Sequence, residues 1–193
     1  MNQLMSKLSL PITSMIRMDH SHVLVTFHKY KPDLPTSQKE ALVKTVCLAL
    51  EIHAQLEEEI FYPALREVST NDEVLAKSVP EHNKMRSLIG QLRDMEPTAT
   101  HYDSTFMTLM REVLHHVADE ETVLLPEAER LLADRLKELG AEMTKRRFAL
   151  AGPRAGEIAA NTAKAMPATT ILVTAGGLMA GGYLLKRALE KRS

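Results

Sequence analysis

The fold of this chain can be inferred from one motif, His53-Ala-Gln-Leu-Glu57-Glu58-Glu59-Ile-Phe-Tyr-Pro63. The chain contains the same pattern again as His116-Val-Ala-Asp-Glu120-Glu121-Thr-Val-Leu-Leu-Pro126. Each copy reads His-x-x-x-Glu-Glu and has a proline ten residues after the histidine. Residues four apart share one face of a helix, so each copy directs an imidazole and a carboxylate to the same side. One such pair is typical of a solvated helix surface, but two matched copies on two long helices indicate a shared site.

The composition limits the classes of protein to which the chain can belong. Its 193 residues suit one domain with an extension, and 45% hydrophobic with 25% charged residues is ordinary for a globular protein. The single cysteine, Cys47, excludes an internal disulfide and a cysteine-based zinc site. Because the N-terminus lacks the pattern of a secretory signal, a cytoplasmic location is expected.

Charge is distributed unevenly along the chain. Residues 144–193 contain nine Lys or Arg and two Asp or Glu, a net charge of +7. The whole chain carries −1, so residues 1–143 carry −8. An acidic body argues against nucleic acid as its partner, whereas the basic end suits a membrane or another anionic partner.

Apolar periodicity predicts an all-α fold, an antiparallel up-down four-helix bundle with a C-terminal helical extension. The helices are expected at residues 15–30, 36–68, 73–96 (or starting after Pro80), 102–125 and 127–148. Pro126 is expected to kink the fourth of these helices or to restart it as the fifth. The body also reads as two helical hairpins, because each His-x-x-x-Glu motif follows an acid-histidine pair by 33 or 34 residues. These pairs are Asp19-His20 and Glu81-His82.

Six polar residues are expected to converge in the middle of this bundle: His20, His53, His82, His116, Glu57 and Glu120. Buried carboxylates without a countercharge are strongly destabilising, and buried imidazoles need partners for both nitrogens. A bound cation meets both needs. Six ligands are too many for one tetrahedral zinc ion, but they suit two ions bridged by the two carboxylates. Nitrogen and oxygen ligands with open positions favour iron or manganese over magnesium or calcium.

These residues resemble the hemerythrin-like HHE cation-binding domain over roughly residues 14–150. The resemblance is carried by Asp19-His20, His53-x-x-x-Glu57-Glu58 with Tyr62-Pro63, Glu81-His82, and His116-x-x-x-Glu120-Glu121 with Leu125-Pro126. It implies a non-haem centre of two iron ions joined by an oxo or hydroxo bridge, with manganese or zinc less favoured. It also implies the ligands His20, His53, Glu57, His82, His116 and Glu120.

Two positions differ from the oxygen-carrying hemerythrins. Those proteins have His-x-x-x-His on the third helix, whereas here Arg86 follows His82 by four residues. Their last carboxylate comes five residues after the histidine, whereas here both Glu120 and Glu121 are available. The candidates for a fifth histidine ligand are His28, His22 and His115. Solvent or Glu121 can fill that position instead, so reversible oxygen carriage is questioned more than metal binding.

The resemblance implies a protein that binds or senses oxygen, a related small molecule (nitric oxide or peroxide), or iron itself. We expect an apolar wall to exclude water from the site, built from Leu24, Leu56, Ile60, Met85 and Val123. The alternative is a di-iron oxidase or a peroxide- or nitric oxide-detoxifying enzyme. No sequence feature identifies an organic substrate pocket, so no catalytic residue is predicted and a non-enzymatic role is favoured. Metal storage or a structural metal is the third class.

The chain is expected to divide after its helical body. Residues 12–150 are predicted to form the HHE domain, 151–167 a linker, and 168–193 an apolar, glycine-rich tail with a basic end. The tail opens with 18 uncharged residues, about 27 Å as a helix, which is marginal for crossing a bilayer. Gly177-x-x-x-Gly181 permits close helix packing. We therefore expect this tail to attach the protein to the inner face of a membrane or to mediate self-association.

Overall fold

The computed structural model describes residues 9–70 and 73–165. Regular structure in these residues is entirely helical. The α-helices are α2 (Ile12–His28), α3 (Thr36–Leu56), α4 (Tyr62–Arg66), α5 (Glu73–Asp94), α6 (Tyr102–Asp119), α7 (Leu125–Leu131), α8 (Leu136–Ala151) and α9 (Ala155–Ala165). Short turns of other helix types join some of them, namely η1 (Glu57–Phe61), η2 (Glu120–Leu124) and η3 (Gly152–Arg154).

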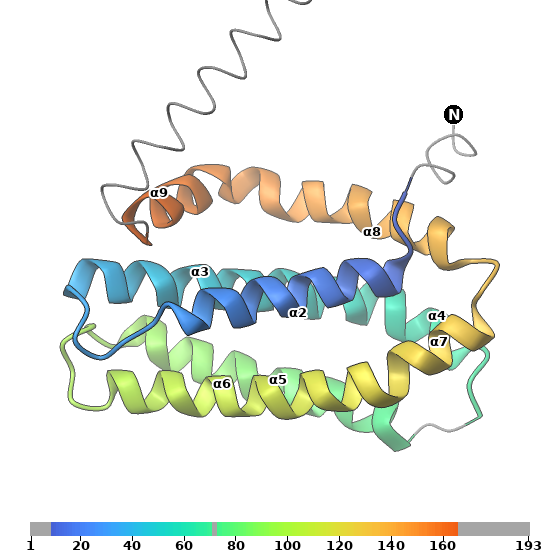
Figure 1. Ribbon diagram of the computed structural model, residues 1–193, viewed down its shortest axis with the longest axis horizontal. Helices are drawn as coiled ribbons and strands as arrows, with labels where there is room; N and C mark the ends of the chain where they lie inside the picture. Colours follow the sequence, from blue (N-terminus) through green and yellow to red (C-terminus); the bar gives the residue numbers. More distant parts are fainter. Residues whose placement is uncertain (1–8, 71–72, 166–193) are drawn as a thin grey trace, which may run out of the picture.

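Four long helices form the body of the molecule. Helices α2 and α3 pack together as one hairpin, and α5 and α6 pack together as a second (Figure 1). Short proline-containing loops connect the two helices of each hairpin, and such loops make neighbouring helices antiparallel. Helix α5 begins at Glu73 and continues through Pro80, so the earlier of its two expected starts is observed. The predicted all-α four-helix bundle is confirmed.

Both copies of the motif contain a π-helical turn, η1 and η2, that begins at the glutamate. In η1 the backbone N–H of Tyr62 donates to the carbonyl of Glu57, five residues earlier, and η2 has the equivalent bond. The next residue in each copy is a proline, Pro63 or Pro126, which has no N–H and clashes with the carbonyl four residues before it. The wider turn accommodates this proline, and π-turns of this kind are frequent at functional sites.

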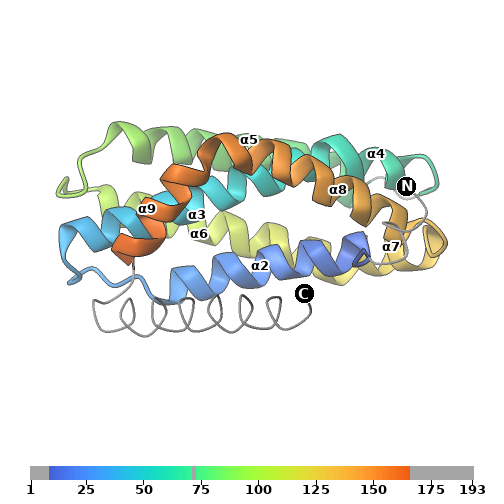
Figure 2. The ribbon, with the colours of Figure 1, turned by 90° about the horizontal axis from the view of Figure 1, so that it is seen from above.

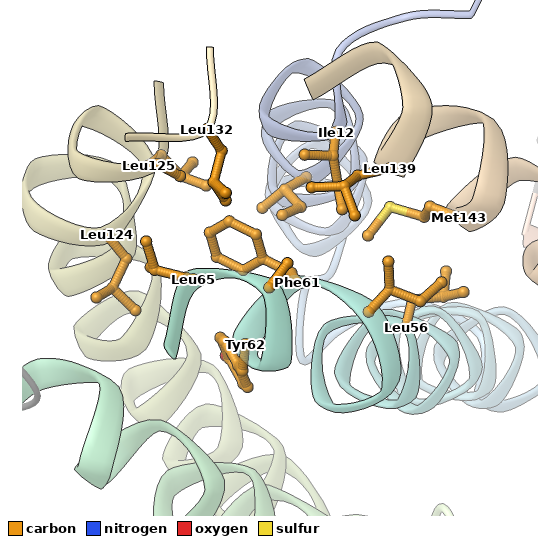
Figure 3. Close-up of a cluster of buried hydrophobic side chains, with 14 of the residues drawn as sticks. Ile12, Leu56, Phe61, Tyr62, Leu65, Leu124, Leu125, Leu132, Leu139 and Met143 are labelled. Atoms are coloured by element: carbon orange, nitrogen blue, oxygen red, sulfur yellow. The ribbon is translucent and has the colours of Figure 1, made fainter. Parts of the chain in front are cut away.

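Among the described residues, buried apolar side chains gather in two clusters. The first lies where η1, α4 and α7 meet α2 and α8, and Figure 3 shows Phe61 between Leu125, Leu132 and Leu139 in it. The second fills the opposite end of the four-helix body and includes Phe106 at its centre. Along α2, His20 follows Ile16 of the first cluster and precedes Val23 of the second. The predicted polar layer therefore lies between the two apolar clusters.

Helices α8 and α9 cover one side of the bundle. Helix α8 packs on α2 and α3, and α9 packs on α3, on the side away from α5 and α6 (Figure 1). Figure 2 shows both lying over the α2–α3 hairpin. The sequence predicts a linker at residues 151–167, but the structure has η3 and α9 here. Residues 155–165 are rich in alanine, the strongest helix former, and the helix gains packing on α3.

The predicted tail, residues 168–193, lies outside the described residues. None of the described helices combines the length and the apolar character needed to cross a bilayer.

Gly140 allows α8 to approach the start of α2. A Cβ atom added to Gly140 would lie 2.0 Å from the carbonyl oxygen of Leu10 and 3.2 Å from the backbone nitrogen of Ile12. These are backbone atoms, so they cannot move aside without displacing α2 from α8.

We expect Gly140→Ala to lower the free energy of unfolding by about 1–3 kcal/mol, as overpacking does in other cores. Gly90→Ala on α5 is the matched control, because no atom of the described residues lies within 4 Å of its added Cβ. The control should be neutral or stabilise by up to about 1 kcal/mol, the difference in helix propensity. Urea unfolding measures both, and equal stabilities would contradict the close contact of residues 10–12 with α8.

Candidate metal centre

The structure brings together all six residues that the sequence predicts as ligands. They come from different helices of the bundle and are each at most 5% exposed, namely His20, His53, Glu57, His82, His116 and Glu120. The histidines lie on α2, α3, α5 and α6, one on each, and the glutamates open the two π-turns. The layer thus depends on every helix of the body.

The inner nitrogens of the histidines face the carboxylates. Nε2 of His20 lies 3.1 Å from Oε2 of Glu120, and Nε2 of His53 lies 3.1 Å from Oε2 of Glu57. Across the layer, Nε2 of His82 comes within 3.4 Å of the same Glu57 oxygen. The ring nitrogens therefore point at oxygens that can share a cation with them.

Among the described residues, the donor atoms form two groups, each with all its atoms within 4.8 Å of one another. The groups are His20, His53, Glu57 and Glu120, and Glu57, His82 and His116. Glu57 belongs to both, so its carboxylate is placed to bridge two ions. Oε2 of Glu120 also lies 3.5 Å from Nε2 of His116, so this second carboxylate faces both groups as well.

Two atoms of the layer have no hydrogen-bond partner among the described residues, Oε1 of Glu57 and Nε2 of His53. Nε2 of His53 is close to Oε2 of Glu57 but is not aligned for a hydrogen bond. Leaving a buried polar atom unpaired costs about 1–3 kcal/mol. A cation would be ligated by both atoms and remove this cost, so the residues present fit a bound metal.

Opposite charges attract one another within the layer. Burial alone would raise the pKa of Glu57, but the imidazoles of His53, His116 and His82 hold that pKa well below its ordinary value. Burial would likewise lower the pKa of His116, but its contacts with carboxylates, Glu57 first, raise it to about 10. Metal binding must displace such a proton, because only neutral imidazole offers a lone pair to a metal.

The outer nitrogen of every histidine in the layer contacts a second carboxylate on a neighbouring helix. The Nδ1–oxygen pairs are His53–Asp19 at 3.4 Å, His82–Glu58 at 2.8 Å, His116–Glu81 at 2.9 Å and His20–Glu121 at 2.9 Å. The contacts form a closed ring. An acid of α2 contacts the histidine of α3, an acid of η1 that of α5, an acid of α5 that of α6, and an acid of η2 that of α2. Such contacts fix the tautomer and orientation of a ligand imidazole. Each of these acids adjoins a predicted ligand in the sequence. Glu121 was expected only as a possible replacement for a fifth histidine ligand, and the other three only as parts of the motifs.

Tyr62 is a further side chain in the layer that the sequence analysis did not assign to the site. Its hydroxyl lies 2.9 Å from Oε1 of Glu120, 3.2 Å from Oε2 of Glu57 and 3.3 Å from Nε2 of His82. Burial next to the two carboxylates raises the pKa of this phenol well above 10, so it donates its proton to them. Leu125 occupies the equivalent position in the second copy, so the site is asymmetric here.

The three candidates for a fifth histidine ligand are all exposed and belong to neither ligand group, namely His22, His28 and His115. Nη2 of Arg86, the third-helix residue that replaces a histidine, lies 2.8 Å from Oε1 of Glu58. Of the two acids in the second motif, Glu120 is fully buried in the layer, whereas Glu121 is 31% exposed and supports His20 from outside.

A small cavity of about 20 Å³ touches all four histidines of the layer. Its remaining walls are mainly apolar and include Val23, Leu50, Met85, Ile89 and Val113. Met85 is the one residue of the expected apolar wall that lines it. Leu56 and Ile60 belong to the first apolar cluster, and Leu24 and Val123 are partly buried.

The chain is similar to known proteins in sequence and in fold. The sequence model described as "Hemerythrin HHE cation binding domain" matches residues 12–128. A crystal structure of a Hemerythrin HHE cation binding domain-containing protein from Mycobacterium kansasii aligns with a TM-score of 0.66 and 19% identity, over 81% of this chain and 99% of that one. A protein named DNA nickase from a Nostoc species is 26% identical over 118 residues, 61% of this chain. This chain spans only 33% of that relative's length. The chain therefore belongs to the hemerythrin HHE cation-binding domain family of metal-binding proteins.

Proposed function

We propose that the protein holds two iron ions in the buried layer and uses them to bind or sense dioxygen, nitric oxide or peroxide. The proposed ligands are two histidines for each ion and two bridging carboxylates: His20 and His53, His82 and His116, and Glu57 and Glu120. Nitrogen and oxygen donors of this kind favour iron, with manganese less favoured. Zinc fits less well because its structural sites close at four ligands.

The observation that carries this proposal is the small apolar cavity against the histidines. A volume of about 20 Å³ accepts one molecule of roughly the size of water, whereas pockets for organic ligands measure about 300–1,000 Å³. Its apolar walls favour an uncharged diatomic molecule over an organic substrate. Bound iron would supply the coordination chemistry, and the protein would exclude water and limit the size of the ligand.

Tyr62 favours a second candidate function, an enzyme that detoxifies peroxide or nitric oxide. Such reactions consume protons, and the Tyr62 hydroxyl holds a proton 2.9 Å from Glu120 in the buried layer. A positioned side chain that transfers a proton typically accelerates a reaction by about 10²–10⁴-fold.

The nickase activity in the relative's name is not part of this proposal. The chain spans a third of that relative, and its residues 1–143 carry a net charge of −8, which opposes binding to DNA. A cytoplasmic location, and attachment to a membrane or self-association through residues 168–193, stay predictions.

Metal analysis and optical spectra of the reduced protein, before and after air, test the proposal. Two iron ions per chain and a charge-transfer band that appears and disappears reversibly with the ligand are expected. Irreversible oxidation with turnover of peroxide or nitric oxide would favour the enzyme instead. Zinc alone, or no metal, would contradict both functions, and iron without small-molecule chemistry would indicate storage or a structural role.

Replacing Glu57 tests its bridging role. We expect Glu57→Gln to reduce the iron content below one ion per chain, because this carboxylate belongs to both ligand groups. The loss of bound metal should also lower the melting temperature, since metal binding stabilises only the folded state. Glu59→Gln, two residues away and exposed, is the control and should keep its iron. Unchanged iron in Glu57→Gln would refute the bridge.

The ring of outer carboxylates predicts a smaller effect at Glu81. Glu81→Gln should weaken iron binding by about 10–100-fold, the usual effect of removing an acid that orients a ligand histidine. Competition with a chelator measures the affinity. Glu112→Gln provides the control, because Glu112 pairs with Lys84 at the surface of the bundle. Equal affinities of the two variants would show that the contact with His116 has no influence on the metal.

Ala54 lines the small cavity and is 5% exposed. Its replacement by leucine should fill the space beside the histidines and lower the affinity for nitric oxide by an order of magnitude or more, with iron content unchanged. Ala64→Leu is the matched control, because Ala64 is equally buried but lies in the first apolar cluster. Nitric oxide titration of the reduced protein measures both. Wild-type affinity in Ala54→Leu would exclude this cavity as the ligand site.

A further inference from the structure

A larger cavity, of about 180 Å³, lies between the α2–α3 hairpin and the helices α8 and α9. Two of its four walls come from residues beyond 128, where the match to the family ends. Most of its surface is apolar, and the apolar side chains that line it are Leu48, Ala49, Ile52, Ala151 and Ile158. An engineered apolar cavity of about 150 Å³ binds benzene, so this space suits a molecule of that size.

Asn161 on α9 supplies a polar group that needs a partner. The residue lines the cavity and is 7% exposed, and its Nδ2 has no hydrogen-bond partner among the described residues. Nε of Arg147, another lining residue, is a second buried donor without such a partner. Buried donors left unpaired are destabilising, so an occupant that brings an acceptor oxygen would be favoured.

The charge in the cavity wall is already balanced. Nη1 and Nη2 of Arg147 lie 2.5 and 2.7 Å from the two carboxylate oxygens of Asp19, a two-bond ion pair. This pairing leaves no free cationic group on Arg147 for an anionic ligand. The combination of apolar walls, neutralised charge and unpaired N–H donors is selective for a neutral molecule with an acceptor.

We propose that this cavity binds a neutral, largely apolar molecule of about the size of a benzene derivative that carries a carbonyl oxygen. Asn161 Nδ2 donates a hydrogen bond to that oxygen, and the apolar walls hold the body of the molecule. Water alone would satisfy the donor but leave the five apolar side chains hydrated. The occupant would lie against Asp19 and His53, which also line the cavity, so the site adjoins the metal layer without depending on the metal's identity.

Isothermal titration of the full-length, metal-loaded protein with two probes tests this site. Acetophenone carries the carbonyl oxygen, and ethylbenzene has nearly the same shape without it. We expect saturable binding of acetophenone that is about 10-fold tighter than that of ethylbenzene, the effect of one net hydrogen bond. Absence of saturable binding, or equal affinity for the two probes, would overturn the proposal.

Variants locate the binding in this cavity. Asn161→Leu, which keeps the branch at Cγ but removes the amide, should weaken acetophenone binding about 10-fold and affect ethylbenzene less. Ala151→Leu should fill the cavity and abolish the binding of both probes. Ala159→Leu, on an exposed position of the same α9, is the control and should bind both as the wild type does. Wild-type binding in the first two variants, with their circular dichroism unchanged, would overturn the assignment.

Discussion

The rest of the structure depends on the need to balance the charge of two carboxylates that have no access to water, Glu57 and Glu120. Their charge must be balanced inside the bundle, and isolated buried charges are too unfavourable to persist. The balance comes from four imidazoles, and each of these is carried by a different helix. A shift of any one helix would therefore remove one partner from the layer. The charge balance and the register of the four helices therefore depend on each other.

In each motif, adjacent residues supply one side chain to the buried layer and one acid to the outer ring. Successive residues on a helix are about 100° apart, so when one faces the centre of a bundle its neighbour faces the next helix. Glu57 faces the layer while Glu58 reaches His82 on α5, and Glu120 and Glu121 divide the same way. In the acid-histidine pairs on α2 and α5 the order is reversed: the first residue, the acid, faces the neighbouring helix, and the histidine after it faces the layer. Four dipeptides thus supply four of the six residues of the layer and all four acids of the ring that orients it.

The sequence was informative wherever a feature occurred twice. The bundle and its six converging residues were predictable because duplication excludes chance, whereas a lone His-x-x-x-Glu pair does not. Tyr62 was missed because its counterpart is Leu125, so it has no repeat to mark it. For the two π-turns, the sequence predicted only a kink or restart at Pro126 and no interruption at Pro63. The backbone bond that spans each wider turn depends on three-dimensional geometry, which the sequence pattern does not reveal. The segment that forms α9 was predicted to be a linker because Gly152-Pro153 is typical of a helix break. The packing of α9 on α3 is a tertiary contact, which the local sequence does not indicate.

The asymmetry of the ring follows from the helices beyond the repeats. Three of the four acids in the ring lie 2.8–2.9 Å from their histidines, whereas Asp19 lies 3.4 Å from His53. Asp19 is also the acid that accepts two bonds from Arg147 of α8. Glu58 and Glu121 also contact a guanidinium, that of Arg86 or Arg17, through one oxygen each. Arg147 instead binds both oxygens of Asp19, which leaves this carboxylate a weaker partner for an imidazole because its charge is more fully neutralised. The α8 extension therefore acts on the buried layer at His53, the histidine whose contact with its outer acid is the longest of the four.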